Sequence, residues 1–154
     1  MAITTAMCNS FKQELLGGVH DLDTDILKIA LIKASPTGTY DKNTTNYSDV
    51  TGNSDEATGS NYTATGQVLS APTDGSTSII NLSNDVAFLD FVDEVFQDVT
   101  VSADGAILYN SSQSGKAIAV FDFGGTITAT AGDFTIVFPD QNSTSAVVRA
   151  TKLR

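Results

Sequence analysis

The chain of 154 residues is short of the residues that most often carry chemistry: it has one cysteine, one histidine and no tryptophan. A single cysteine excludes an intrachain disulfide. The apolar neighbours of Cys8, Met7 and Phe11, indicate a buried small hydrophobic side chain. Cys8 and His20 are too few ligands for a structural zinc site.

Positive charge is also scarce, because eight basic residues face 18 acids and the formal net charge is -10. Scattered Lys and Arg cannot form the basic patch that nucleic acid or an anionic membrane surface requires. We therefore expect neither partner. The acidity favours either a solvated surface or docking onto a basic protein surface.

Long apolar runs are missing as well, since no stretch approaches the ~18 residues of a membrane helix. The start of the chain lacks a basic region followed by an apolar run, so we expect that the protein is made in a cytoplasm and carries no secretory signal.

Uncharged polar residues take the place of charges, which make up 17% of the chain, while 41% is hydrophobic. Ser, Thr, Asn and Gly are poor helix formers, so this mixture favours β structure. The length suits one domain. We predict a single β domain spanning residues 1–154.

One segment, residues 4–17, has helical periodicity. Thr4 or Thr5 can cap its start, and Gly17–Gly18 ends it, with the first glycine placed for a left-handed C-cap. A helix this short needs packing, either on its own sheet or on a neighbouring subunit. Its apolar residues are Ile3, Met7, Phe11, Leu15 and Leu16.

Short aliphatic or alternating segments, separated by turn residues, fill most of the remaining chain. Their regular spacing, without helical patterns between them, favours an antiparallel β-sandwich or jelly-roll-like fold with one N-terminal helix. The predicted strands are residues 26–33, 65–70, 78–82, 86–91, 99–109, 116–123, 134–139 and 146–150.

Three turn signals and one long polar stretch interrupt these strands. Pro72–Gly75 predicts a turn, Gly124–Gly125 predicts a break, and Asp104–Gly105 predicts a bulge or a turn inside one long element. Residues 37–63 predict a long polar loop or arm. That arm lies on a surface, reaches a neighbour, or is a solvated loop.

Two acidic clusters were tested as chemical sites. Asp21, Asp23 and Asp25 alternate as in a calcium loop, but Ile26 and Ile32 occupy the positions where an EF-hand needs glycine and glutamate. A second cluster lies between apolar residues, which indicates a strand end and a polar turn, not the facing pair of a glycosidase. It consists of Asp90, Asp93, Glu94 and Asp98.

The remaining catalytic patterns are incomplete. His20 has no Gly-x-Ser-x-Gly nucleophile motif to serve and is expected to be a turn residue beside the helix end. Gly17–Gly18 and Gly124–Gly125 lack the Gly-Lys-Ser/Thr of a phosphate loop. We predict a non-enzymatic protein with no catalytic, cofactor-binding or metal-binding residue.

Six stretches carry a resemblance that covers nearly the whole chain: residues 1–20 (MAITTAMCNSFKQELLGGVH), 27–31 (LKIAL), 59–67 (GSNYTATGQ), 105–110 (GAILYN), 119–125 (AVFDFGG), and 132–135 with 138–139 (GDFT and FP). They resemble a group of short proteins encoded by tailed phages, including marine and cyanobacterial phages. The resemblance implies a virion structural protein and supplies no catalytic residue.

Within that group, the expected function is capsid decoration or cement: binding the outer surface of the assembled major capsid protein. Cement proteins usually act through symmetric contacts, so a homotrimer or homodimer is expected. One alternative is a tail, neck or baseplate component, or a virion protein that binds a host receptor or glycan. A second is a virion-associated hydrolase that uses His20 and the acids around Asp90.

Overall fold

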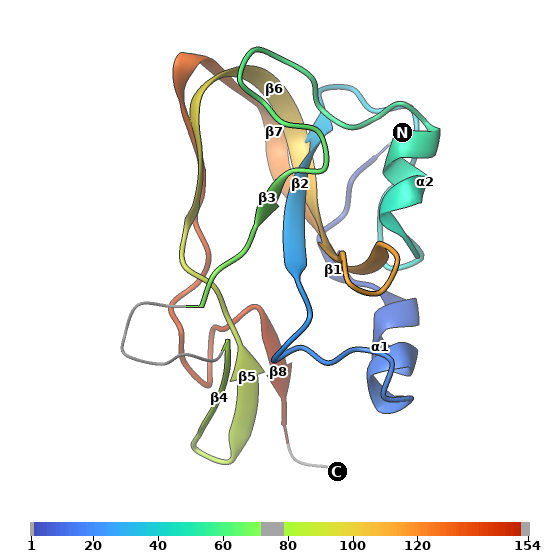
Figure 1. The fold of residues 1–154 in the computed structure, drawn as a ribbon, viewed down its shortest axis with the longest axis vertical. Helices are drawn as coiled ribbons and strands as arrows, with labels where there is room; N and C mark the ends of the chain where they lie inside the picture. The colour runs from blue at the N-terminus through green and yellow to red at the C-terminus, as the bar shows by residue number, and fades with distance from the viewer. Residues whose placement is uncertain (1, 72–78, 152–154) are drawn as a thin grey trace.

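Antiparallel strands make up most of the regular secondary structure in the computed structural model, which describes residues 2–71 and 79–151. The mainly β, antiparallel prediction is confirmed, whereas the sandwich or jelly-roll arrangement stays a prediction. The predicted turn at 72–75 and the first residue of the predicted strand 78–82 lie outside the described residues. Figure 1 labels β1 (Ala6–Met7), β2 (Leu27–Lys33), β3 (Gln67–Val68), β4 (Ile80–Ser83), β5 (Val86–Leu89), β6 (Glu94–Asn110), β7 (Lys116–Ile136), β8 (Val148–Ala150), α1 (Asn9–Leu16) and α2 (Tyr47–Gly52).

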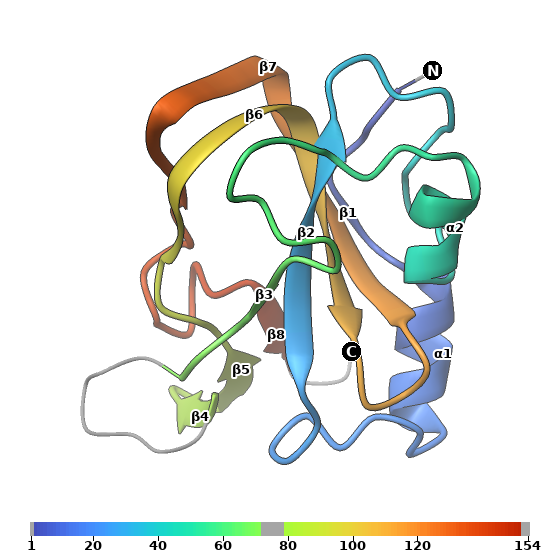
Figure 2. The ribbon, with the colours of Figure 1, turned by 45° about the horizontal axis from the view of Figure 1, so that its top comes forward.

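The strands form two sheets. A five-stranded sheet has the order β1-β7-β6-β2-β3, and a three-stranded sheet has the order β4-β5-β8. Both helices lie on one side of the molecule and the bent half of the β6–β7 hairpin on the other, as both views show (Figures 1 and 2). The smaller sheet lies below the open end of the hairpin in Figure 1.

The β6–β7 hairpin dominates the larger sheet, with strands of 17 and 21 residues. Its pairing runs from Asn110↔Lys116 to Glu94↔Ile136. The predicted strands 116–123 and 134–139 are therefore the two ends of one strand. The predicted strand end near Asp90 is present, since β5 ends at Leu89, but the predicted polar turn does not include Glu94 or Asp98, which lie in β6.

A bulge bends this hairpin where the sequence predicted a break. Between the pairs Gly105↔Asp122 and Ala103↔Ile127, β6 advances two residues (103 to 105) and β7 advances five (122 to 127). Gly124 and Gly125 have φ of 76° and 154° and absorb the extra length. The glycine pair thus bends β7 without ending it, and the bulge alternative for Asp104–Gly105 is confirmed.

Strand β2 is central, as its aliphatic run predicted. It pairs with β6 from Leu27↔Asn110 to Lys33↔Ala103, and with β3 on its other side. The four residues from Ile29 to Ile32 are all fully buried, so both faces of the strand contribute to the core.

The N-terminal helix begins later than residue 4. Residues Ala6–Met7 instead form β1, which pairs with Ala119 and Val120 on the edge of β7. A sheet edge has unpaired backbone groups that an extended neighbour can satisfy. This pairing outweighs the helical spacing, and α1 starts only at Asn9.

The helix α1 ends at the predicted glycine pair, but the first glycine is not the predicted left-handed cap. The helix ends at Leu16, and Gly17 keeps a right-handed conformation with φ of -80°. Gly18, with φ of 70°, is the left-handed residue. Phe11 is fully buried, whereas Leu15 and Leu16 are exposed, so the helix packs through its first turns only.

Residues 37–63 fold back onto the core and do not form an extended arm. The segment contains α2, whose start is closed by a capping box between Asn46 and Asp49. Tyr40, Val50 and Ala57 are buried in the main core. The many polar residues of this segment hydrogen-bond its own backbone, which composition alone could not reveal.

Candidate interaction surfaces

His20 lies in a buried polar cluster, not in a cleft. Its Nε2 is 3.0 Å from the Glu14 carboxylate and its Nδ1 is 3.0 Å from Asn110 Nδ2. Asn110 Nδ2 also donates to Asp25 at 2.6 Å, so the facing His20 Nδ1 is the acceptor and Nε2 the donor. The histidine is confirmed beside the helix end, where it joins α1 to β6.

The same cluster holds α1 against β7. Lys116 Nζ forms an ion pair with Glu14. Partial burial alone would raise the pKa of Glu14, but hydrogen bonds from Lys116 and His20 outweigh burial and lower the pKa. Glu14 is therefore ionised at neutral pH and fixes the last turn of α1 in place.

The acids at 21–25 belong to a turn. Asp25 accepts hydrogen bonds from the backbone of Asp21 and from the side chains of Asn110 and Gln113. In the stretches that the structure describes, no group of three or more His, Cys, Asp or Glu side chains is placed to hold a metal ion.

The acids around Asp90 do not converge on an open cleft. Asp90 is fully buried, and burial, together with the charges of Asp140 and Asp93, raises its pKa. One of its oxygens accepts from Phe91 N at 2.9 Å, and Asp93 accepts from Phe138 N at 2.9 Å. These contacts order the chain between β5 and the end of β7.

Cys8 is fully buried, as predicted, and burial raises the pKa of its thiol to about 12. The thiol therefore stays protonated at neutral pH and acts as a small apolar side chain.

A cluster of tyrosines surrounds Glu56, and no sequence pattern pointed to it. The hydroxyls of Tyr47 and Tyr62 donate to the Glu56 carboxylate, which also accepts from Thr65 N at 2.7 Å. Burial raises the pKa of Tyr109 to about 12, and it raises the pKa of Tyr47 and of Tyr62 as well. The phenols are neutral hydrogen-bond donors that hold residues 47–65 on the sheet.

Beside this cluster is a polar cavity of about 370 Å³. The rings of Tyr47 and Tyr109 stack at 4.5 Å on its wall, and hydroxyl and amide side chains surround them. Its remaining lining residues are Lys28, Asn46, Ser48, Thr65, Ser111, Ser114 and Gly115.

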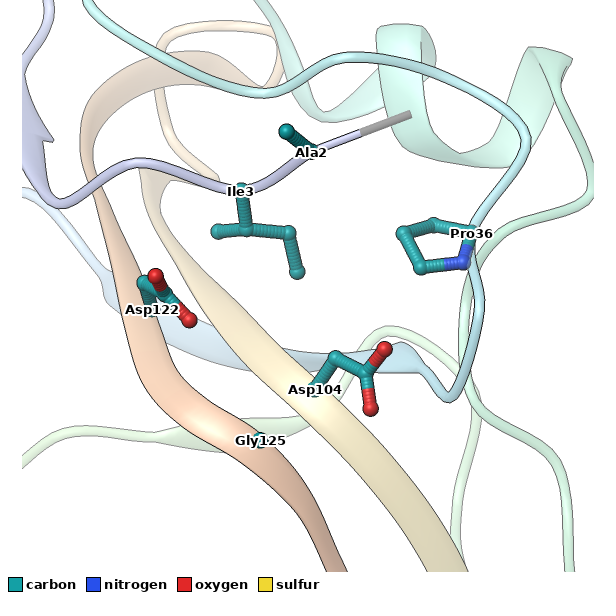
Figure 3. Close-up of a pocket in the computed structure, with 6 residues that line it drawn as sticks. All are labelled: Ala2, Ile3, Pro36, Asp104, Asp122 and Gly125. Carbon is teal, nitrogen blue, oxygen red and sulfur yellow. The ribbon is translucent and has the colours of Figure 1, made fainter.

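Figure 3 shows a second cavity, of about 240 Å³, at the bend of the hairpin. Asp104 accepts from Ser35 N at 2.8 Å and from the Thr126 hydroxyl, and Asp122 accepts from Gly124 N at 2.9 Å. Both oxygens of Asp104 are engaged, so this carboxylate secures the bend.

The most apolar concave surface is on β7 and the segment after it. Two cavities of about 400 and 330 Å³ share Phe123, Ile136 and Val137 in their walls. Val137 and Ile127 are exposed beside them. The alternation of apolar residues along β7 is a sequence signal for this surface. Because a break was predicted at residues 124–125, the two halves of β7 were treated as separate strands.

The end of α1 carries further exposed apolar side chains, Leu15, Leu16 and Val19, which we call the helix-tip surface. Leu16 is 92% exposed, and Leu15 and Val19 are each 37% exposed. The sequence placed Leu15 and Leu16 on the apolar stripe of the helix, but the helix is too short to bury them.

The chain is thus a mainly β protein with exposed apolar surfaces at β7 and at the end of α1. No helix in the described part is long and apolar enough to cross a membrane. Comparison with protein-family models, with curated proteins and with solved structures finds no match.

Proposed function

We propose that this chain is a non-enzymatic structural protein of a phage virion, which decorates the capsid by binding the outer surface of the assembled major capsid protein. The sequence resemblance is the starting point. The observation that supports it most is the helix-tip surface, where Leu16 is 92% exposed. An exposed group of large apolar side chains beside polar residues is typical of a protein-binding site.

The helix-tip surface is held in a fixed orientation. Phe11 anchors the first turns of α1 in the core, and Glu14 is bound by Lys116 and His20 immediately before the leucines. A rigid anchor loses little conformational entropy when it binds. Burying one leucine contributes about 1.5–3 kcal/mol, so this surface suits a contact repeated many times.

Decoration works by mass action on many equivalent sites. A protein that binds only the assembled shell stabilises each site by RT ln(1 + [L]/Kd), about 2.7 kcal/mol at one hundred times Kd. No single strong bond is needed. We expect a homotrimer or homodimer at each position, a location on the capsid surface, and no contact with nucleic acid or membrane.

Copy number in purified particles tests this function. Quantitative mass spectrometry of the virion is expected to find the chain at a fixed ratio to the major capsid protein. Its removal is expected to lower the temperature at which particles release DNA. A few copies per particle, or absence from particles, would contradict the proposal.

The polar cavity beside Tyr47 and Tyr109 favours a second candidate, a tail, neck or baseplate protein that binds a host receptor or glycan. Hydroxyl and amide groups around aromatic rings suit a sugar. Binding on a glycan array, lost in Tyr47→Ala and retained in Leu16→Gln, together with immunogold label at the tail, would favour this candidate over decoration.

A further inference from the structure

The outer edge of β7 beyond the bend has no strand partner among the described residues. β6 pairs with β7 along its whole length, but β1 covers the opposite edge only at Ala119 and Val120. Figure 2 shows the bent half of β7 on the outer side of the hairpin, with β6 inside it. Its outward backbone groups are therefore open to another strand.

This edge lacks two of the usual guards against pairing and keeps a third, the bulge at Gly124–Gly125. Natural edge strands are commonly protected by charged side chains or by proline. Residues 123–132 contain neither, and from Gly124 to Ala131 every side chain is exposed except the half-buried Ala129. Positive φ angles at Gly125 and Ala131 leave residues 126–130 as the regular part.

The regular part is complementary to itself. Thr126, Thr128 and Thr130 alternate with Ile127 and Ala129. In an antiparallel pair, directly opposed residues lie on the same face of the sheet. If Thr128 meets Thr128 of a second copy, threonines face threonines and Ile127 faces Ala129.

The distribution of charge favours the same arrangement. Two copies that each carry -10 repel one another unless they meet at an uncharged surface. Residues 126–130 carry no charged side chain, so a pairing centred on Thr128 brings no two charges into direct opposition along the regular part.

We propose that two copies of this chain associate by antiparallel pairing of their β7 edges about a two-fold axis at Thr128, which joins two five-stranded sheets into one. The inference does not depend on capsid binding: it rests on the free edge, the alternation and the absence of charge.

Charge substitutions at the axis test it. Sedimentation equilibrium of the full chain is expected to show a concentration-dependent dimer. Thr128→Glu and Thr128→Lys each place two like charges across the axis, which is expected to weaken dimerisation by at least about tenfold. Mixing the two variants in equal amounts pairs opposite charges and is expected to restore a dimer. Gln97→Glu, on the exposed face of β6, adds the same charge away from the edge and should leave the dimer unchanged.

Three results would overturn the proposal: a wild-type chain that remains monomeric, a Thr128→Glu variant that dimerises normally, or a mixture that stays monomeric. Circular dichroism checks that each variant is folded. If a variant is not folded, hydrogen exchange of the wild type decides. Amides at 126–130 must become more protected as concentration rises, and unchanged exchange would overturn the pairing.

Discussion

Two aspartates, Asp55 and Asp90, are both fully buried, yet their surroundings shift the pKa of the two carboxyl groups in opposite directions. Burial alone would raise the pKa of Asp55, but the Thr37 and Gly38 amides, the Tyr40 hydroxyl and Lys33 outweigh it and hold that pKa well below its ordinary value. Asp90 accepts one hydrogen bond, from Phe91 N, and its second oxygen has no partner. Ionisation therefore stabilises the fold at one site and destabilises it at the other.

We predict that Asp55→Asn lowers the free energy of unfolding by about 2–4 kcal/mol at neutral pH. Thr37 N donates to one carboxylate oxygen at 2.9 Å and Gly38 N to the other at 2.7 Å. An amide has one oxygen, so one of these fixed donors would face an NH2 group. Urea unfolding measures the change.

Asp90→Asn is the matched control, because the side chain is equally buried but burial raises its pKa and so disfavours its charged form. An asparagine oxygen can keep the bond from Phe91 N, so the expected change is within about 1 kcal/mol. Equal losses in the two variants would contradict the account of Asp55.

The two sites also predict opposite dependences on pH. The folded pKa of Asp55 is depressed, so its stabilisation is fully present above the unfolded value of about 3.9 and is lost as pH falls through the folded pKa. Burial raises the pKa of Asp90, so its carboxyl binds a proton more readily in the folded state and destabilises the fold as pH rises.

Unfolding free energy measured from about pH 7 to about pH 2 is expected to fall less steeply in Asp55→Asn than in the wild type. In Asp90→Asn the stability relative to the wild type should be higher at neutral pH than at acid pH. If the unfolding free energy of Asp55→Asn fell more steeply with decreasing pH than that of the wild type, the assigned effect of the Asp55 carboxylate would be wrong. If Asp90→Asn gained stability relative to the wild type at acid pH, the assigned effect of Asp90 would be wrong.

At the scale of elements, the bend in β7 depends on glycine geometry. Gly124 has φ of 76°, a conformation that costs other residues about 1–2 kcal/mol. Gly124→Ala is therefore expected to lower the unfolding free energy by that amount, although nothing within 4 Å would contact the new methyl group.

Gly132→Ala serves as the comparison within the same strand. Gly132 has no positive φ, and the nearest atom to an added Cβ is 3.7 Å away. This variant is expected to retain wild-type stability in thermal or urea unfolding. A Gly124→Ala variant as stable as Gly132→Ala would mean that the bulge is not strained.

Sequence patterns predicted the elements whose signal is local. The aliphatic run at 27–33 was sufficient to predict a buried strand, and Gly17–Gly18 was sufficient to predict the end of the helix. Burial and chain reversal follow here from the residues themselves. Strand β1 was missed because its partner is more than a hundred residues away at Ala119 and Val120. A pairing that distant leaves no mark in the local periodicity.

The candidate surfaces were predictable only in part. The apolar stripe of α1 was visible in the sequence, but Leu16 follows the buried Phe11 by five residues, about 140° around an α-helix, so its side chain points away from the core. Similarly, the free edge of β7 exists because Gly124–Gly125 bends the strand, whereas the sequence pattern alone favoured a break.

For the whole molecule, internal polar bonding accounts for a chain with so few charges. The Asp55, Glu56 and His20 clusters each hold a loop or helix against the sheet, and all three are built from side chains that composition suggested were surface residues. These groups are satisfied inside the molecule, and the two proposed contacts rest instead on uncharged regions, the helix-tip surface and the β7 edge.

The proposed capsid contact leads to the last prediction, for Leu16→Gln. Leu16 is 92% exposed, so its replacement is expected to change unfolding free energy by no more than about 0.5 kcal/mol. Loss of one buried leucine at a contact weakens binding by about 1.5 kcal/mol or more, which is at least tenfold in Kd.

Leu82→Gln is the control, because Leu82 is 76% exposed on β4, outside the helix-tip surface. Both variants, added at increasing concentration to assembled shells that lack the protein, are compared by pelleting the shells. Reduced occupancy for Leu16→Gln alone is expected, since the two variants lose the same apolar area at different places. If Leu16→Gln occupies the shells as fully as the wild type does, the end of α1 is excluded as the contact. If Leu16→Gln and Leu82→Gln both lose occupancy to the same extent, the contact surface extends to the smaller sheet.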